Sequence, residues 1–177
     1  MTPVALDGAL DRLRGSVAAG GQFGGPPGGP TSKLSSGVWL NRDPEAKVAG
    51  RWSSPAGRLA EMQLDVEKPG RWLGLHIVLP PFEALGLTWL SLTLRAHAAR
   101  PMAIRPCLRS GAGEGFTDSF FDRHMLLRPA VSDHAGLMAL ARYPDVPDVA
   151  PWRELILFLP PAEDLSFALH ELRLVGL

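Results

Sequence analysis

The chain has 177 residues, enough for one domain and a short appendage but not for a second full core. Lys and Arg number 18 and so do Asp and Glu, so the formal net charge is zero and we expect no nucleic-acid partner bound through bulk charge. A single cysteine excludes a disulfide scaffold and a four-thiolate zinc site, and no apolar run approaches the roughly 18 residues of a membrane span.

Residues 1–19 are predicted to form a short amphipathic helix, because Leu6, Leu10 and Leu13 recur at helical spacing. A helix of about 15 residues is marginal by itself in water, so we expect this stripe to pack either on its own domain or on a partner. The segment lacks the basic start and apolar run of a secretory signal, which predicts no signal peptide and a cytoplasmic location at synthesis.

Residues 20–36 are predicted to be a linker arm. Nine of the eleven residues in 20–30 are Gly or Pro, and such a composition buries too little surface to offset the entropy of ordering it. We hypothesise that the arm attaches the protein to a protein partner in a larger assembly or an oligomer.

From residue 37 to residue 177 the apolar pattern changes to a period of two. Apolar and polar residues alternate in four segments: 59–66, 71–79, 88–98 and 102–109. Three further segments are apolar runs: 136–142, 154–159 and 165–175. Short alternating strands separated by Pro, Gly and Asp turns are typical of an antiparallel β-sandwich. We therefore predict an all-β jelly roll, preceded by the helix and the arm.

Two strands carry an irregularity. In 165–175 the apolar residues change parity between Leu169 and Leu172, which predicts a β-bulge near His170 and Glu171. Pro106 lies inside the strand 102–109, where a missing N–H predicts either a sheet edge or another bulge.

The three residues 99–101 have a length suited to a hairpin between the strands 88–98 and 102–109. That pairing would put Arg95 opposite Arg105, and like charges directly opposite each other need an internal carboxylate, open solvent or an anionic ligand. We hypothesise a binding face for acidic or hydroxyl-rich sugars, with Trp89 as a stacking platform; the alternatives are a solvated face or arginines paired with nearby aspartates. The candidate ligand-binding residues of this face are Trp89, Arg95, His97, Arg105 and Arg109.

The segment 115–124 (GFTDSFFDRH) is predicted to be a loop or a strand that enters a site. It adds Asp118, Asp122 and Arg123 to the candidate ligand-binding residues. Together with His124 the two aspartates could ligate a metal, but their spacing matches no metal geometry, so we predict no metal and no cofactor. The alternative is an Asp–Arg network that holds a long connection.

Nothing in the sequence favours catalysis. No G-x-S-x-G motif surrounds a serine, and Cys107 lies on a predicted strand, where we expect it to be inert. We predict that the protein is not an enzyme. An enzyme on this fold would need His97 or His124 beside a carboxylate.

The alternating strands, the segment GFTDSFFDRH and the closing strand LSFALHELRLVGL resemble the non-catalytic carbohydrate-binding modules with a galactose-binding-like jelly-roll fold. The resemblance covers residues 36–177 and implies glycan binding through a concave sheet face or through loops at one edge. Such modules often carry a structural calcium; the acidic residues near the corresponding position are Asp43 and Glu45.

The combined hypothesis is a non-catalytic glycan-binding subunit. Its arm would attach it to an assembly such as a phage-like particle, released by lysis, and its sandwich would recognise capsular polysaccharide on a host surface. The alternatives are a purely structural subunit that contacts neighbours through exposed apolar surface such as Trp39 or Trp52, or a polysaccharide-active enzyme.

Overall fold

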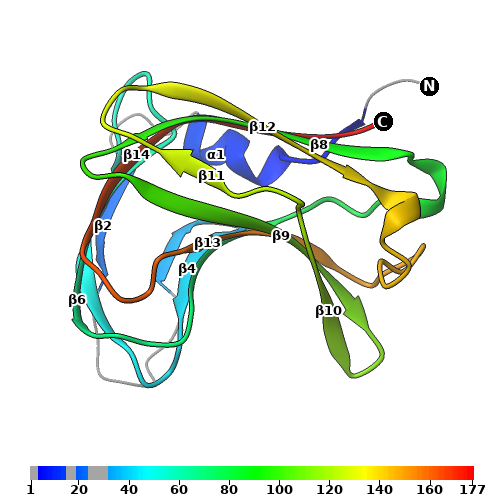
Figure 1. The fold of residues 1–177 in the computed structure, drawn as a ribbon, viewed down its shortest axis with the longest axis horizontal. Helices are drawn as coiled ribbons and strands as arrows, with labels where there is room; N and C mark the ends of the chain where they lie inside the picture. Colours follow the sequence, from blue (N-terminus) through cyan, green and yellow to red (C-terminus); the bar gives the residue numbers. More distant parts are fainter. Residues whose placement is uncertain (1–3, 15–18, 24–31) are drawn as a thin grey trace.

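The computed structural model describes residues 4–14, 19–23 and 32–177, and it consists of two antiparallel sheets packed face to face (Figure 1). Sheet A has the order β12 (Ser132–Ala139), β8 (Trp89–Ala98), β14 (Leu165–Gly176), β6 (Ala60–Lys68), β5 (Lys47–Ser54) and β2 (Ala19–Phe23), with β1 (Val4–Ala5) paired to the end of β14. Sheet B has the order β10 (Gly115–Phe120), β9 (Met102–Ala112), β13 (Arg153–Leu159), β7 (Leu73–Val78), β4 (Val38–Arg42) and β3 (Ser32–Ser35), with β11 (Met125–Leu127) paired to β9. The predicted all-β sandwich is confirmed.

The core lies between the two sheets, because each strand turns one face inward. In β8 the buried residues Leu90, Leu92 and Leu94 alternate with outward-facing ones, as period two requires. Burying a side chain of this size stabilises the fold by about 1.5–3 kcal/mol relative to leaving it exposed. The core continues through both sheets as one cluster.

The predicted bulge near His170 is present, but Pro106 lies at neither a sheet edge nor a register shift against β13, because β9 is paired on both sides. The pairing of β14 with β8 shifts register between Leu169 and Glu171, which confirms the bulge. Pro106 lies where β9 changes partner, between the stretch paired with β11 and the stretch paired with β10. Its carbonyl accepts the Phe121 N–H at 3.1 Å, on the side of β10 and β11. Because the nitrogen and the carbonyl of a strand residue point to the same side, the proline nitrogen faces the gap between β10 and β11, where no N–H is needed.

The N-terminal apolar stripe packs on its own domain. Leu6, Leu10 and Leu13 are buried in the core, and the Leu6 N–H donates to the Leu174 carbonyl at 2.8 Å. The helix is shorter than predicted, because β1 precedes it and only η1 (Gly8–Leu10) and α1 (Asp11–Arg14) are helical. Residues 1–3 and 15–18 of the predicted helix lie outside the described residues.

Two strands of the structure lie within the segment predicted to be a linker arm. Residues 20–23 belong to β2, which pairs with β5, and residues 32–35 form β3, which pairs with β4. Glycine suits β2 because a Cβ at Gly21 would lie 2.8 Å from the Trp52 indole nitrogen, so this strand packs too closely for side chains. Residues 24–31 of the predicted arm lie outside the described residues.

The predicted hairpin between β8 and β9 is wrong, because the two strands belong to different sheets. Residues 99–101 carry the chain from sheet A to sheet B. The Ala98 and Ala99 N–H groups donate to the carbonyls of Arg128 and Ser166, so the end of β8 is bonded to other parts of the chain. Alternation indicates which face a side chain occupies but does not distinguish a hairpin from a crossover between sheets.

Two further short helical turns lie in connections, η2 (Ala84–Gly86) and η3 (Leu140–Arg142). Sheet B forms the lower layer in Figure 1, and β10 extends below it at one end. The outward side of sheet B is therefore bordered by a projecting strand, which bears on the site described next.

Candidate functional site

The outward-facing side chains of sheet B form the candidate site, called here the sheet B face. Strand register places Asp118, Arg109 and Glu154 in one row across β10, β9 and β13, and places Ile156 and His76 side by side on β13 and β7. The members of this face, from β10 to β4, are Phe116, Asp118, Phe120, Arg105, Cys107, Arg109, Glu154, Ile156, Phe158, Gly74, His76, Val78, Trp39 and Asn41. Aromatic and charged side chains therefore share one surface.

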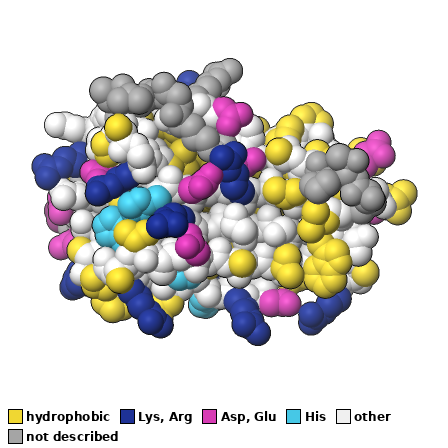
Figure 2. Space-filling model, turned by 90° about the horizontal axis from the view of Figure 1, so that it is seen from above, with side chains coloured by type: hydrophobic (Ala, Val, Ile, Leu, Met, Phe, Trp, Pro, Cys, Tyr) yellow, Lys and Arg dark blue, Asp and Glu magenta, His cyan; other side chains and the backbone are white. Residues whose placement is uncertain are grey.

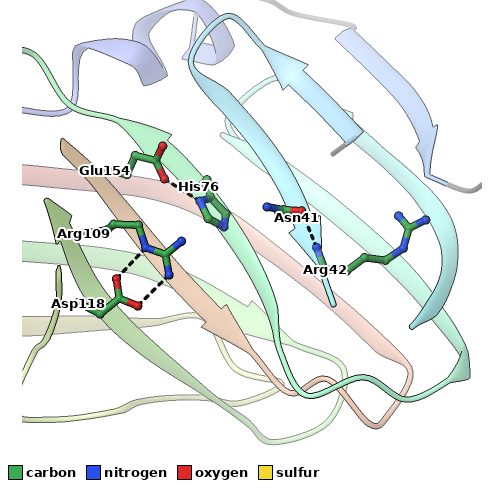
Figure 3. A network of polar contacts seen from close by, with 6 residues as sticks. All are labelled: Asn41, Arg42, His76, Arg109, Asp118 and Glu154. Carbon is green, nitrogen blue, oxygen red and sulfur yellow. Dashed lines mark hydrogen bonds and ion pairs between the residues drawn. The ribbon is translucent and has the colours of Figure 1, made fainter. Parts of the chain in front are cut away.

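His76 lies near the centre of this face and is only 3% exposed. Its Nδ1 lies 2.8 Å from the Glu154 carboxylate (Figure 3). Its ring also stacks on the Trp39 indole, with the two ring centroids 5.5 Å apart. Its Nε2 is buried and has no hydrogen-bond partner among the described residues. The tautomer of the ring decides whether Nε2 donates or accepts, so this nitrogen is a polar atom that a ligand group of either kind can bond.

Arg109 and Asp118 form a two-bond ion pair beside His76 (Figure 3). Nε and Nη2 of the guanidinium donate to the two carboxylate oxygens, both at 2.7 Å, which is the geometry of the strongest arginine–carboxylate contacts. The Asp118 carboxylate raises the pKa of Arg109, chiefly through these hydrogen bonds. The guanidinium also lies 3.8 Å from the centroid of the Phe116 ring, so the pair is held from two sides.

Two aromatic rings stand on the neighbouring strands. Phe120 and Phe158 meet with centroids 5.7 Å apart, and Arg105 places its guanidinium carbon 3.6 Å from the Phe120 ring centroid. Cys107 lies beneath them and is fully buried. Burial raises the pKa of its thiol to about 12, which agrees with the prediction that it is inert.

Two adjoining pockets open on the sheet B face. One, of about 240 Å³, is lined by Trp72, His76, Arg109, Asp118 and Phe158. The other, of about 410 Å³, shares Trp72 and Phe158 with the first, and its other lining residues are Arg71, Ala103, Arg105, Phe120, His124, Leu159, Pro160 and Pro161. The two pockets together are called here the sheet B groove. The volume of the larger one falls in the range of ligand sites, about 300–1,000 Å³, and the volume of the smaller one lies just below it.

Gly74 lies on the outward side of sheet B, next to His76 and Ile156. It pairs with Phe158 on one side and Asn41 on the other, and a Cβ there would lie 2.9 Å from a methyl carbon of Ile156 and 3.3 Å from His76 Nε2. A larger residue would cover the free nitrogen of His76. The glycine therefore leaves that nitrogen without a side chain over it at this position, although the nitrogen is buried in the free protein.

Trp72, the wall common to both pockets, is held by a carboxylate clamp. Asp43 Oδ2 accepts the backbone N–H of Arg71 at 2.9 Å and its Nε–H at 2.8 Å, and the Asp43 N–H donates to the Trp72 carbonyl at 3.0 Å. These bonds, led by the one from the Arg71 side chain, lower the pKa of Asp43 to about 2. A Cβ at Gly70 would lie 2.7 Å from the Asp43 Cβ, so the turn before Trp72 needs glycine to approach so closely.

Of the predicted site residues, three lie on the opposite surface. Trp89, Arg95 and His97 face outward from sheet A, whereas Arg105 and Arg109 face outward from sheet B, so the expected common face is wrong. Arg95 lies 3.5 Å from the Asp133 carboxylate, an ion pair that the sequence analysis named as an alternative.

The outer face of sheet A holds a hollow of its own, of about 380 Å³, with His97 in its lining. His97 Nδ1 lies 2.9 Å from His170 Nε2, and Figure 2, which views this side, shows histidines gathered with basic and acidic side chains beside them. Burial lowers the pKa of His170, and the neighbouring His97 lowers it further. No buried side-chain polar atom without a partner is found among the described lining residues of this hollow.

The predicted loop residues divide between two places. Asp118 lies on β10 and joins the sheet B groove, while Asp122 accepts the Tyr143 hydroxyl at 2.6 Å and lies 3.3 Å from Arg142. Asp122 thus pins the connection after β12, as the network alternative expected. Burial, with this hydrogen bond second, raises the pKa of Tyr143 to about 12. Arg123 is exposed beyond the end of β10.

Sequence reasoning missed Trp72, His76, Glu154 and Phe158. The sequence carried a signal for Trp72 and His76, because they and Gly74 are the outward positions of an alternating strand. A glycine between two aromatic side chains leaves space between their rings. Glu154 and Phe158 carried no such signal, since their strand is an almost continuous apolar run.

Among residues 4–14, 19–23 and 32–177, no three His, Cys, Asp or Glu side chains are grouped to hold a metal ion. No helix in these ranges is long and apolar enough to cross a membrane.

No family pattern matches this sequence, and no curated protein matches it. Solved structures with the same fold include the family 11 carbohydrate-binding module from Clostridium thermocellum, bound to a β-1,3-1,4-mixed-linked tetrasaccharide (TM-score 0.54, 12% identity, 91% of this chain and 97% of that one). The family 30 module of a cellulosomal cellulase of the same organism is similar too (TM-score 0.54, 11% identity, 98% and 97%). So is the xyloglucanase domain of a type three effector from Sinorhizobium fredii (TM-score 0.50, 9% identity, 89% and 99%).

At these identities the likeness establishes the fold. The carbohydrate-binding modules among these neighbours agree with the resemblance found in the sequence, and the xyloglucanase domain has the same fold.

Proposed function

We propose that this protein is a carbohydrate-binding module that holds a polysaccharide chain in the sheet B groove. The observation that carries the proposal is His76 Nε2, a buried polar nitrogen without a partner among the described residues, beside a pocket walled by Trp72 and Phe158. A buried polar atom left unbonded costs about 1–3 kcal/mol, which a hydroxyl group of a bound sugar would offset. The likeness of fold to modules of families 11 and 30 supports the same reading.

The groove has the groups that a sugar needs. The ring faces of Trp72 and Phe158 suit the apolar C–H face of a pyranose, while the Asp118 carboxylate and the Arg109 guanidinium can bond its hydroxyls. Because Asp118 and Arg109 already hold each other at 2.7 Å, their geometry is set before the ligand arrives. Binding then costs less ordering entropy.

A pair of tryptophan variants tests the location. In affinity electrophoresis through gels that contain soluble polysaccharides, Trp72→Ala should weaken binding about tenfold, which corresponds to about 1.4 kcal/mol. Trp89→Ala is the matched control, because Trp89 is 40% exposed on the outer face of sheet A. Loss of binding in the control alone would move the site to sheet A, and no retardation by any polysaccharide would refute the proposal.

A second pair tests the role of the free nitrogen. His76→Phe keeps a ring against Trp39 but removes Nε2, so it should weaken binding. Glu154→Gln retains an acceptor for Nδ1–H and leaves Nε2 in place, so it should bind nearly as the natural protein does. If both variants bind alike, and both unfold at the same temperature as the natural protein, the nitrogen is not a ligand contact.

We propose binding rather than hydrolysis, although a xyloglucanase domain shares the fold. A glycosidase needs a carboxyl group free to donate a proton to the glycosidic oxygen. In this groove Asp118 is bonded to Arg109, and Glu154 is bonded to His76. Prolonged incubation with a bound polysaccharide should release no reducing ends, and their release would favour the enzyme alternative.

The narrower hypothesis, attachment of a phage-like particle to capsular polysaccharide, also needs a segment that docks on the assembly. Leu6, Leu10 and Leu13 are used in the protein's own core, so the remaining part of the predicted arm is residues 24–31, which lie outside the described residues. The narrower hypothesis requires that deleting them releases the subunit from its particle without weakening polysaccharide binding. Unchanged incorporation would refute that attachment.

The purely structural alternative expected contacts through Trp39 or Trp52. Trp52 is 7% exposed and offers little apolar surface, while Trp39 is half-buried and has one ring face against His76. Light scattering separates the two functions, since a stable oligomer without polysaccharide binding would favour the structural subunit.

A further inference from the structure

We propose that the sheet B groove selects an acidic polysaccharide, and that Arg105 binds the carboxylate of a uronic acid residue in the larger of the two pockets. This inference rests on the proposed function and adds the chemical class of the ligand. It also assigns separate tasks to the two pockets. The smaller one bonds hydroxyl groups, and the larger one bonds negative charge.

The first observation is that Arg105 lacks a carboxylate partner. Arg109 is bonded to Asp118 and Arg71 is bonded to Asp43, but Arg105 makes no ion pair with a described residue. Its guanidinium instead lies flat on the Phe120 ring, with 3.6 Å between the guanidinium carbon and the ring centroid. Stacking orients the guanidinium and leaves its edge N–H groups free to bond a ligand.

The second observation is the charge of the pocket around it. The larger pocket is lined by Arg71, Arg105 and His124, and its lining includes no Asp or Glu. Arg71 uses Nε for its ion pair with Asp43, and that guanidinium is largely exposed. In a chain of zero net charge, this places the charge of Arg105, which has no ion-pair partner among the described residues, at one end of the groove.

The third observation is the combination of charge with ring faces. Trp72, Phe120 and Phe158 line the same pocket, so a sugar ring could stack there while its substituent reaches Arg105. A planar carboxylate matches the two parallel N–H donors of a guanidinium better than a hydroxyl does. Aromatic walls also exclude water, which strengthens that attraction. A uronic acid offers both features in one residue.

The experiment compares an acidic polymer with its neutral counterpart. Polygalacturonate and alginate are tested beside the same polymers after chemical reduction of the carboxyl groups, by isothermal titration calorimetry at 150 mM salt. The natural protein should bind one of the polyuronates at least tenfold more tightly than its reduced form. Dextran sulfate serves as a polyanion without carboxylates and should bind more weakly than that polyuronate.

The variants locate the contact. Arg105→Gln should lose about tenfold in affinity for the polyuronate and leave the affinity for the reduced polymer unchanged. Arg95→Gln, on the outer face of sheet A, is the matched control and should bind both polymers as the natural protein does.

Each contrary outcome has a separate meaning. Equal affinity for polyuronate and reduced polymer would overturn the charge selection and leave the carbohydrate-binding proposal standing. Equal affinity for dextran sulfate would overturn carboxylate recognition in favour of general attraction to polyanions. Absence of binding to every polysaccharide, neutral and acidic, would overturn the proposed function itself.

Discussion

The N-terminal segment offers a quantitative test of whether it is part of the sandwich or an attachment arm. Leu10 is 1% exposed and belongs to the core cluster, so Leu10→Ala removes three buried carbons and leaves a cavity. Substitutions of this kind cost about 2–5 kcal/mol, and because Leu10 lies on a short helical turn that can settle inward, we expect about 3 kcal/mol. In a free arm the same substitution would leave the free energy of unfolding unchanged.

The assay is equilibrium unfolding in urea, followed by tryptophan fluorescence. Leu85→Ala is the matched control, since Leu85 is 78% exposed on η2 and its loss should change the free energy of unfolding by less than about 0.5 kcal/mol. The slope of that free energy against urea should stay the same in both variants. Equal stability of Leu10→Ala and Leu85→Ala would refute the assignment of this segment to the core.

Two further predictions concern single side chains. Cys107 is fully buried, and burial raises the pKa of its thiol to about 12. Iodoacetamide at pH 8 should therefore leave the folded protein unmodified and should modify Cys107 completely in urea, as mass spectrometry would record. Modification before unfolding would contradict this. His170 has a lowered pKa, first through burial and then through His97, so the unfolded chain binds more protons near pH 6 and the free energy of unfolding should fall between pH 7 and pH 5. His170→Asn should show a shallower fall in urea titrations across this range, and an identical slope would count against the assignment.

Period two was sufficient to predict the fold class and the face that each side chain occupies. Arg95 and Arg105 both point outward, as their parity indicates, and the bulge between Leu169 and Glu171 follows from the change of parity alone. These features are local, because successive side chains on a strand must point to opposite faces. Burial of one face then orients the strand.

Strand neighbours could not be predicted in the same way. The strand β8 pairs with β14, for example Phe167 with Ala98, and no local pattern connects segments so far apart. A three-residue connection at 99–101 serves a hairpin or a crossover equally well. The predicted binding face failed at this step, since it assumed that adjacent strands share a sheet.

The wall of the groove depends on contacts of the same long-range kind. Asp43 and Arg71 are 28 positions apart, and their ion pair fixes the turn that carries Trp72. In the sequence, Asp43 is notable only as one of two acidic residues near the position where similar modules carry calcium. In the structure its two carboxylate oxygens accept backbone and guanidinium N–H groups, so this side chain positions an aromatic wall.

The two outer faces differ in how far the protein satisfies its own polar groups. On sheet A, Arg95 pairs with Asp133 and His97 pairs with His170, so these two predicted site residues have partners within the chain. On sheet B, the Nε2 of His76 and the guanidinium of Arg105 have none among the described residues, although each lies against an aromatic ring. Leaving the buried His76 Nε2 unpaired lowers the stability of the free protein, and a bound ligand can offset that loss. The Arg105 guanidinium is exposed and therefore solvated, so it is open to a ligand without such a cost. The groove on sheet B is therefore the surface on which a ligand would gain most.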